Sequence, residues 1–314
     1  MRIINSMEAL EQLKNETMTC AISIGKFDGI HAGHQLLLEE VLKRKEEGML
    51  ATVFTFFPSP EELFKGEHLP AIDTIVEKRQ RFMEMGIDLL IEYPLTYQTA
   101  SISPKDFMNQ ILWQNLHAGY IVSGSDLSFA DKGAGNADML RKFAVEKGFQ
   151  YEVVDKVVID ATVVSSTVIR KAIEEGNIEF ANRLLHRNYQ VSGIVERGKQ
   201  LGRTIDVPTI NITADPQKLL PKKGVYVSRS LIDEKWIYGI SNVGSKPTVK
   251  DNDVINVETH LFDINEDLYG KCVITEFISF VRGEKKFSSV TELAEQMKKD
   301  VTYGKNYVGS VRND

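Results

Sequence analysis

Apolar and polar positions alternate over the first 187 residues in a way that predicts strands and helices in turn. Continuous apolar runs, which are typical of buried strands, occur at residues 20–24, 50–57, 88–93 and 120–122. Apolar residues recur at helical spacing in residues 35–44, 77–85 and 139–147. Ser103 can cap a further helix that has Pro104 in its first position. Strands that alternate with helices imply a parallel sheet covered by helices on both faces.

The pattern changes after about Arg187. Residues 189–280 form short β-rich runs that Gly, Pro, Asn and Asp interrupt, which predicts a small closed antiparallel barrel or a sandwich. Two helices at 166–175 and 178–186 are expected to bridge the two parts, and a last helix is expected over about 290–300, capped by Ser288 or Ser289. The sequence therefore predicts an α/β domain at 1–187 and a β domain with a terminal helix at 188–314.

Composition fits this division and narrows the class of partner. A chain of 314 residues, 42% hydrophobic and 26% charged, is long enough for two domains that each bury a core. The formal net charge of −6 disfavours general binding of nucleic acid, so anionic nucleotides need local donors and a divalent cation. We find no long apolar run and no charged-then-apolar leader, and expect neither a membrane span nor a signal peptide. Cys20 and Cys272 lie in apolar strand-like contexts, so we expect two buried thiols in a reducing cytoplasm.

The ten residues from Gly25 to His34, GKFDGIHAGH, stand between a predicted strand and a predicted helix. Open α/β sheets bind ligands at this carboxyl edge of their strands. His31 and His34 share one face of the first helical turn, where free backbone N–H groups and the helix dipole favour an anion. Gly25, Gly29 and Gly33 allow tight turning and close approach of a ligand. The pattern favours a triphosphate site, and a metal-binding His pair or two structural histidines are the alternatives.

Two further segments lie next to predicted strands or helix starts. In residues 164–170, VSSTVIR, Ser165 or Ser166 can begin a helix whose N–H groups and hydroxyls hold phosphate oxygens. Arg170 can then neutralise charge on a group in transfer. Residues 123–130, SGSDLSFA, form a polar segment after a strand. Taken alone, a capped helix with a surface Arg and a plain turn explain both segments at least as well.

The second half carries its own candidate phosphate and metal ligands. Residues 198–204, GKQLGRT, form a glycine-bearing turn that could wrap a phosphate chain. In the PTIN segment that follows, Thr209 and Asn211 are two residues apart, so on a strand they face the same way. A hydroxyl and an amide carbonyl are hard oxygen ligands suited to Mg²⁺. Turn-associated Thr and Asn are the structural alternative.

Together these motifs resemble the prokaryotic bifunctional riboflavin kinase/FAD synthase family. GKFDGIHAGH resembles the nucleotidyltransferase signature, SSTVIR the family's Ser-Ser-Thr-x-Ile-Arg, and PTIN its Pro-Thr-x-Asn. NVGSKPT at 242–248 resembles Asn-Ile-Gly-x-Arg-Pro-Thr, and VETHL at 257–261 resembles Val-Glu-x-His-Leu, whose Glu is the general base on the riboflavin 5′-hydroxyl. The resemblance implies an α/β nucleotidyltransferase domain with a Rossmann-like parallel sheet, followed by a riboflavin-kinase-like antiparallel barrel.

The same resemblance implies two activities in a cytoplasmic enzyme. It implies transfer of AMP from ATP to FMN, giving FAD and diphosphate, and phosphorylation of riboflavin, with Mg²⁺ as cofactor. The implied catalytic residues are His31, His34, Ser166, Arg170 and Glu258. ATP is expected at Gly25, Phe27, Asp28, Gly29, Gly33, Ser165, Thr167, Gly202 and Arg203. The flavin is expected at Gly124, Asp126, Phe129 and Asn242, and the metal at Thr209 and Asn211.

The chain also departs from the family pattern. Leu127 and Ala130 replace a Phe and a Gly, and Phe57 and Ser59 replace two residues of an Asp/Asn-Pro-His-Pro segment. Residues 205–207 are Ile-Asp-Val instead of Leu-Gly-Phe, and a carboxylate there costs on the order of a few kcal/mol beside anionic ATP. Arg197 stands where many members have His. Two alternatives therefore stay open: a FAD synthase whose second domain is a weak or inactive kinase, and a flavin-binding regulatory protein without catalysis.

Overall fold

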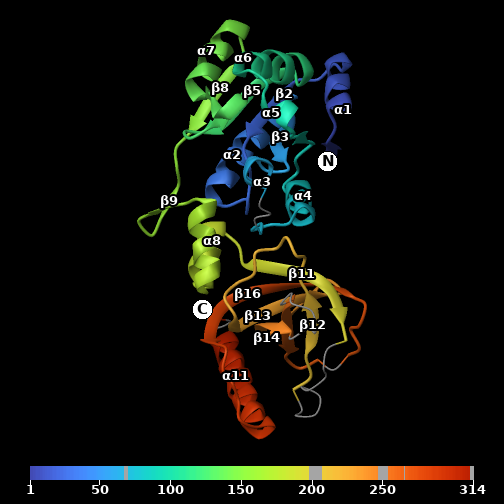
Figure 1. Ribbon diagram of the computed structural model, residues 1–314, viewed down its shortest axis with the longest axis vertical. Coiled ribbons are helices and arrows are strands. Elements are labelled where there is room, and N and C mark those ends of the chain that lie inside the picture. Colours follow the sequence, from blue (N-terminus) through green and yellow to red (C-terminus); the bar gives the residue numbers. More distant parts are fainter. Residues whose placement is uncertain (67–69, 198–206, 247–253, 265, 312–314) are drawn as a thin grey trace. The chain divides into compact units, whose positions relative to one another are not determined.

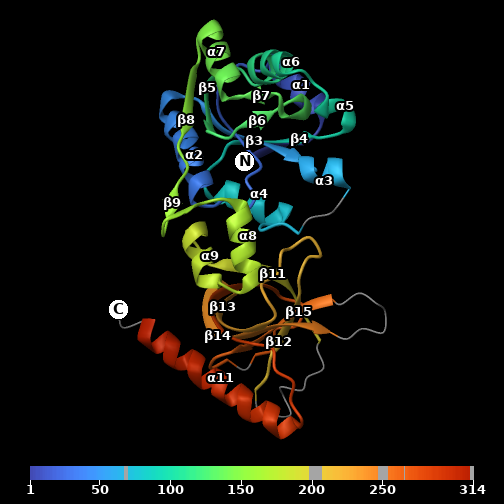
Figure 2. The ribbon, with the colours of Figure 1, turned by 60° about the vertical axis from the view of Figure 1, so that its left-hand side comes forward.

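The computed structural model describes residues 1–66, 70–197, 207–246, 254–264 and 266–311 (Figures 1 and 2). The chain divides into two compact units, Met1–Ser165 and Ser166–Asp314. Helices α8 (Ser166–Glu175) and α9 (Ile178–Leu185), which we expected between the two domains, fall within the second unit. The domain limits of 1–187 and 188–314 stay a prediction.

A parallel sheet of six strands forms the centre of the first unit. Its strands are β1 (Arg2–Ile4), β2 (Cys20–Ile24), β3 (Leu50–Phe57), β4 (Leu89–Pro94), β5 (Ala118–Gly124) and β8 (Gln150–Val154). They lie in the order β1-β4-β3-β2-β5-β8, and every neighbouring pair is parallel. Two short antiparallel pairs accompany the sheet: β6 (Ser128–Phe129) with β7 (Gly135–Asn136), and β9 (Val158–Ile159) with β10 (Thr162–Val163). The predicted parallel sheet is confirmed.

Helices connect these strands as the sequence pattern predicts. The α-helices are α1 (Met7–Gln12), α2 (Ala32–Lys43), α3 (Pro60–Lys65), α4 (Ile75–Glu84), α5 (Tyr97–Ala100), α6 (Pro104–Asp106) and α7 (Ala137–Lys147). Short 3-10 turns are η1 (Leu13–Asn15), η2 (Arg44–Glu47) and η4 (Asp131–Gly133). The Ser103 hydroxyl accepts the N–H of Asp106, which confirms the predicted cap. The segment after it, η3 (Phe107–Asn115), is a π-helix, and this wider winding was not visible in the apolar spacing.

Side chains of β2 alternate between two hydrophobic cores, one on each face of the sheet. Cys20 and Ile22 belong to one core with Leu10 of α1 and residues of the π-helix. Ala21 belongs to the other core, which α2 and α4 supply with Leu38 and Phe82. All five residues of β2 are buried. The strand therefore lies at the centre of the sheet, and its carboxyl end delivers residue 25 to the middle of the ligand edge.

The second unit contains a closed antiparallel barrel, as predicted. Its strands are β11 (Tyr189–Glu196), β12 (Ile210–Thr213), β13 (Gly224–Ile232), β14 (Lys235–Lys246), β15 (Val254–Leu261) and β16 (Cys272–Gly283). They close in the order β11-β12-β15-β14-β13-β16, and each described pair is antiparallel. Each described strand of the barrel therefore has two neighbours, although β11 pairs with β12 only at Val195 and Glu196.

The terminal helix α11 (Val290–Val311) packs on the barrel at β14 and is longer than the predicted 290–300 (Figure 2). The Ser289 hydroxyl accepts the N–H of Glu292, so Ser289 is the cap. A Cβ at Gly304 would lie 2.6 Å from Cδ1 of Ile240 and 2.9 Å from Cζ of Phe262. Gly304 is therefore a contact point with the barrel and does not end the helix.

The two cysteines differ in exposure. Cys20 is a buried free thiol, and burial raises its pKa to about 11, so it remains protonated and unreactive. Cys272 is also free but exposed, so the expectation of a second buried thiol is wrong. It is the first residue of β16, and Val273 takes the inward position in the alternation. Among the described helices, none has the length and apolar character needed to cross a membrane.

Ala130 has φ 63° and ψ −163°, a conformation that glycine alone adopts without strain. We expect Ala130→Gly to raise the free energy of unfolding of the first unit by about 1 kcal/mol. Urea unfolding followed by Trp113 fluorescence in a Trp236→Phe background measures this unit, because the other tryptophan lies in the barrel. The matched control Ala144→Gly, inside α7, should lower that free energy by about 1 kcal/mol. A decrease for Ala130→Gly would contradict the strain.

Candidate functional sites

The loop from Gly25 to Ile30 joins the central strand β2 to helix α2. Phe27, Gly29 and Ile30 have φ of 52°, 85° and 40°, so the chain turns sharply here. A Cβ at Gly29 would lie 2.9 Å from Cγ2 of Ile72, which leaves room only for glycine. Oδ1 of Asp28 accepts the N–H of Ile72 at 2.9 Å. Asp28 therefore braces the loop against the segment before α4.

Phe27, a predicted ATP-binding residue, has its ring in the core under this loop. Its side chain is fully buried, with ring centroids 5.7 Å from Phe82 and 5.1 Å from His34. Only the backbone of Phe27 can therefore contact a nucleotide. The Phe27 ring anchors the loop in the core and packs against the His34 ring.

His31 is the N-cap of α2. Its Nδ1 accepts the backbone N–H of His34 at 3.3 Å. The two imidazoles stack with centroids 3.7 Å apart and planes at 14°. A Cβ at Gly33 would lie 3.4 Å from the His31 ring, so the small residue leaves space for the stack. The structure thus brings together the two histidines that the spacing predicted, at a helix start where anions bind.

Both imidazoles are neutral at physiological pH. Burial lowers the pKa of His31 to about 4. Burial holds the pKa of His34 well below its usual value, and electrostatic repulsion from His31 and Lys78 lowers it further. Because Nδ1 of His31 accepts a hydrogen bond, its proton resides on Nε2. His31 is therefore a neutral donor whose tautomer the helix backbone fixes.

Lys78 on α4 is a further cation near the pair that motif spacing did not reveal. Its Nζ lies 3.5 Å from the carbonyl oxygen of Lys26, within the same loop. Burial lowers its pKa, while the carboxylates of Asp28, Glu92 and Asp73 act to raise it. No pattern in residues 75–84 distinguishes Lys78 from a surface lysine. Its contact with Lys26 arises because the loop after β2 packs near α4, which the local sequence does not encode.

The predicted flavin residues after β5 form a tight turn. The N–H of Leu127 bonds the Gly124 carbonyl at 3.2 Å, and the exposed Asp126 pairs with Lys156 at 3.0 Å. Phe129 is buried, with its ring centroid 5.1 Å from that of Phe107. Its side chain is thus a core residue that fixes the turn, while Gly124 and Asp126 stay at the carboxyl edge of β5.

Ser166, Thr167 and Arg170 lie in the first turns of α8, in the second compact unit, and Ser165 immediately precedes them. Thr167 is exposed, and the other three are half-buried. The predicted helix start is confirmed. An approach of these residues to the His31–His34 pair stays a prediction.

In the barrel, strand register brings three residues that are distant in sequence into one row. Glu258 on β15 pairs with Asn211 on β12 and with Asn242 on β14. Residues paired directly across antiparallel strands point to the same face. The candidate base, a candidate metal ligand and a candidate flavin ligand therefore stand side by side. Gly202 and Arg203, the predicted phosphate residues, lie outside the described residues.

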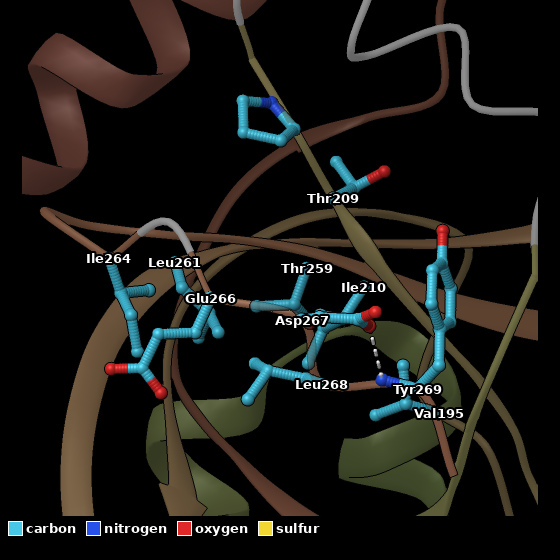
Figure 3. A pocket seen from close by; sticks show the side chains of 11 residues that line it. Val195, Thr209, Ile210, Thr259, Leu261, Ile264, Glu266, Asp267, Leu268 and Tyr269 are labelled. Atoms are coloured by element: carbon cyan, nitrogen blue, oxygen red, sulfur yellow. Dashed lines mark hydrogen bonds between the residues drawn. The ribbon is translucent and has the colours of Figure 1, made fainter. Parts of the chain in front are cut away.

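A pocket lies at the neighbouring paired positions Ile210 and Thr259, whose side chains alternate to the face opposite that of Asn211 and Glu258 (Figure 3). Thr209 lines it, together with apolar side chains that include Val195, Ile210, Leu261 and Leu268. Tyr269 forms another wall, and its N–H bonds Oδ1 of Asp267 at 3.1 Å. The guanidinium carbon of Arg197 lies 5.4 Å from the centroid of the Tyr269 ring. Arg197 therefore adds positive charge next to a mixed pocket that the Glu266 and Asp267 carboxylates also line.

Two polar residues hold the strands that carry these groups. Nδ1 of His260 lies 2.8 Å from the carbonyl oxygen of Pro208, so the ring donates from Nδ1 and fixes the backbone before Thr209. Nδ2 of Asn256 donates to Oδ1 of Asn211 at 2.7 Å. Sequence reasoning missed Asn256, because only the strand pairing reveals its contact with Asn211.

Comparison with known proteins relates both units to one set of enzymes. A family model described as FAD synthetase matches residues 13–168, and one described as riboflavin kinase matches residues 185–308. The bifunctional riboflavin kinase/FMN adenylyltransferase of Buchnera aphidicola is 33% identical over 317 residues, covering 100% of both chains. The one from Listeria monocytogenes is 32% identical over 282 residues, covering 89% of both chains. A crystal structure described as a macrolide-efflux protein from Streptococcus pneumoniae superposes with a TM-score of 0.85 at 29% identity, covering 96% of this chain and 97% of that one.

The lowered pKa of His31 predicts a pH-dependent stability of the first unit. The unfolded chain takes up a proton at His31 below pH 6.5, whereas the folded chain resists until about pH 4. The contribution of His31 to the free energy of unfolding should therefore be fully present above pH 6.5 and fall by about 3 kcal/mol between pH 6.5 and 4. Urea unfolding at a series of pH values measures this.

His31→Asn is the matched control, because Asn caps helices well and does not titrate. This variant should lose the part of the pH dependence that His31 contributes while keeping its stability at pH 7.5. An identical pH dependence in both proteins would refute the assignment to His31.

Proposed function

The chain belongs to the family of bifunctional riboflavin kinase/FMN adenylyltransferases, and from that premise we propose that its two units carry two successive transfers. The first unit adenylylates FMN, and the second phosphorylates riboflavin. The observation that carries the proposal is the stacked pair of neutral histidines at the start of α2, on the ligand edge of the sheet. It is supported by the row of Asn211, Glu258 and Asn242 across three strands of the barrel.

In the adenylyl transfer, a phosphate oxygen of FMN attacks the α-phosphorus of ATP. The new O–P bond forms as the bond to the bridging oxygen breaks, and diphosphate leaves with that electron pair. No side-chain nucleophile is needed, because the FMN phosphate is already anionic. The protein positions both reactants and stabilises charge on the phosphates. We assign the Nε2–H donor of His31 and its partner His34 to this role.

In the phosphorylation, the riboflavin 5′-hydroxyl attacks the γ-phosphorus of ATP, and ADP leaves. The proton of the hydroxyl passes to the Glu258 carboxylate. Asn211 and Asn242 flank Glu258 on the neighbouring strands, so they are close enough to orient it and its substrate. The apolar side chains of the pocket at Val195, Leu261 and Leu268 suit a nucleotide base, whereas its Glu266 and Asp267 carboxylates disfavour a phosphate beside them.

Thr209 and Asn211 would hold Mg²⁺ in the kinase site. Both offer neutral oxygens, and the described residues contain no cluster of three or more His, Cys, Asp or Glu for a metal. Such a donor set suits Mg²⁺, which binds few protein oxygens and completes its shell with water and phosphate. When bound, the ion neutralises phosphate charge. The buried Asn211 keeps its oxygen in place through the bond from Asn256.

For the adenylyl transfer, purified protein incubated with FMN, ATP and Mg²⁺ should form FAD, resolved by chromatography. His31→Asn keeps a helix cap but removes the Nε2 donor, so we expect a roughly 100-fold lower rate of FAD formation. Riboflavin phosphorylation by the same variant is the internal control and should persist. Undiminished FAD formation would exclude the assigned role of His31.

For the phosphorylation, the wild-type chain with riboflavin, ATP and Mg²⁺ should form FMN and then FAD. Glu258→Gln has the same shape but a weaker base, and should lower the rate of FMN formation by roughly 10²- to 10⁴-fold. Its rate of FAD formation from FMN should not change. FAD from FMN alone in the wild type would leave the first assignment standing and overturn the second. Absence of product from both substrates favours a non-catalytic flavin-binding protein.

A further inference from the structure

We propose that Asn256 is a positioning residue of the kinase site that holds Asn211 and Glu258 in one fixed relation. This inference rests on the proposed function of the second unit. Asn256 belongs to none of the motifs described above. It lies on β15, two residues before Glu258, so the two side chains point to the same face.

One amide group of Asn256 serves both neighbours. Its Nδ2 lies 2.7 Å from Oδ1 of Asn211 and 3.4 Å from Oε1 of Glu258. An amide nitrogen carries two hydrogens, so it can donate to both acceptors. The shorter contact is a strong hydrogen bond, and the longer one is at the outer limit of hydrogen-bond geometry. Asn256 therefore mainly orients Asn211 and links it to Glu258.

The neighbours also fix which way the Asn256 amide points. If the amide turned over, its oxygen would face the oxygens of Asn211 and Glu258, three acceptors without a proton between them. In the observed orientation, Oδ1 of Asn256 is buried and has no hydrogen-bond partner among the described residues. Burying an amide oxygen without a partner is unfavourable. The amide is therefore explained by its donations to Asn211 and Glu258, which accompany this unfavourable burial of Oδ1.

Backbone packing around Asn256 leaves room for polar groups. Asn256 pairs with Gly244 on β14. A Cβ at Gly244 would lie 2.9 Å from Oε1 of Glu284 and 3.1 Å from Nδ2 of Asn242. Polar side chains from β12, β14 and β15 and the residue after β16 thus gather at one place in the wall. The unpartnered oxygen of Asn256 lies within this cluster, ready for a water or a substrate hydroxyl.

The consequence for binding follows from the geometry of Asn211. Its amide oxygen has two lone pairs: Asn256 uses one, and the other stays available for a cation. Without the donor from Asn256, the Asn211 side chain can rotate, and its oxygen is no longer held. Loss of such a supporting contact typically lowers metal affinity or activity 10- to 100-fold.

The test compares wild type with Asn256→Leu and Asn256→Asp, which have similar shape but lack the donors. In a Trp113→Phe background, Trp236 fluorescence reports thermal unfolding of the barrel. Mg²⁺ with ADP should raise the barrel's Tm in wild type more than ADP with EDTA does. Both variants should lose most of this Mg²⁺-dependent increase. In kinase assays they should need roughly 10- to 100-fold more Mg²⁺ for half-maximal rate, while FAD formation from FMN stays unchanged.

Two further variants separate positioning from folding. Ser230→Ala removes a buried barrel hydrogen bond to Thr275, 2.9 Å long and between other strands. It should lower the Tm without ligand but keep the increase from Mg²⁺ with ADP. Asn256→Gln retains an amide donor and should recover part of the Mg²⁺ response, even if Asn256→Leu folds poorly.

The proposal is overturned if Asn256→Asp and Asn256→Gln both keep the wild-type Mg²⁺ response. It is also overturned if Asn256→Leu behaves like Ser230→Ala. A wild type that forms no FMN from riboflavin and shows no Mg²⁺-dependent increase refutes the proposed kinase function, and the role of Asn256 falls with it. If the wild type forms FMN and shows the Mg²⁺-dependent increase, and the Asn256 variants do the same, only the role of Asn256 is refuted.

Discussion

Every buried strand must pair its backbone groups on both edges, and this requirement determines where both candidate sites lie. In the first unit, β2 pairs with β3 and β5 and is buried along its whole length, so its carboxyl end opens at the middle of the sheet edge. In the barrel, β15 lies between β12 and β14, and the pairing sets Glu258 between Asn211 and Asn242. Neither arrangement depends on the site residues themselves. The scaffold fixes the positions, and the residues at those positions supply the chemistry.

Burial then decides the charge of the groups at the first site. A positively charged imidazole would attract phosphate in water, yet burial keeps His31 and His34 neutral. Neutral imidazoles still donate hydrogen bonds, and the cap at His34 N–H leaves the His31 proton on Nε2. Positive potential at this loop comes instead from the helix start and from Lys78, which itself is surrounded by carboxylates. At this site the neutral imidazoles therefore donate hydrogen bonds, while other groups supply the positive potential.

The sequence predicts many of the strands, helices and site residues. Predictions from it are wrong or incomplete where a feature depends on contacts between residues distant in the sequence. Apolar runs locate β2 and β3 to the residue, and Ser and Pro punctuation locates α6, because these signals are local. The π-helical winding of Phe107–Asn115 and the extension of α11 past Gly304 depend on packing against other elements, which spacing does not encode. Cys272 carries the same local signal as a buried residue, and only the strand register turns it outward. Lys78 and Asn256 were missed for the same reason, since their partners are distant in sequence or two positions along a strand.

The departures from the family pattern near the kinase motif have opposite charges. Asp206, which lies outside the described residues, adds a carboxylate where the family has Gly, and this disfavours an anionic nucleotide. Arg197 adds a permanent positive charge where many members have a titratable His, and its guanidinium lies over Tyr269 at the pocket. The sum of the two changes relative to a neutral His and a Gly is zero, because one adds a positive and the other a negative charge. The intact row around Glu258 favours a working kinase over a weak or inactive one.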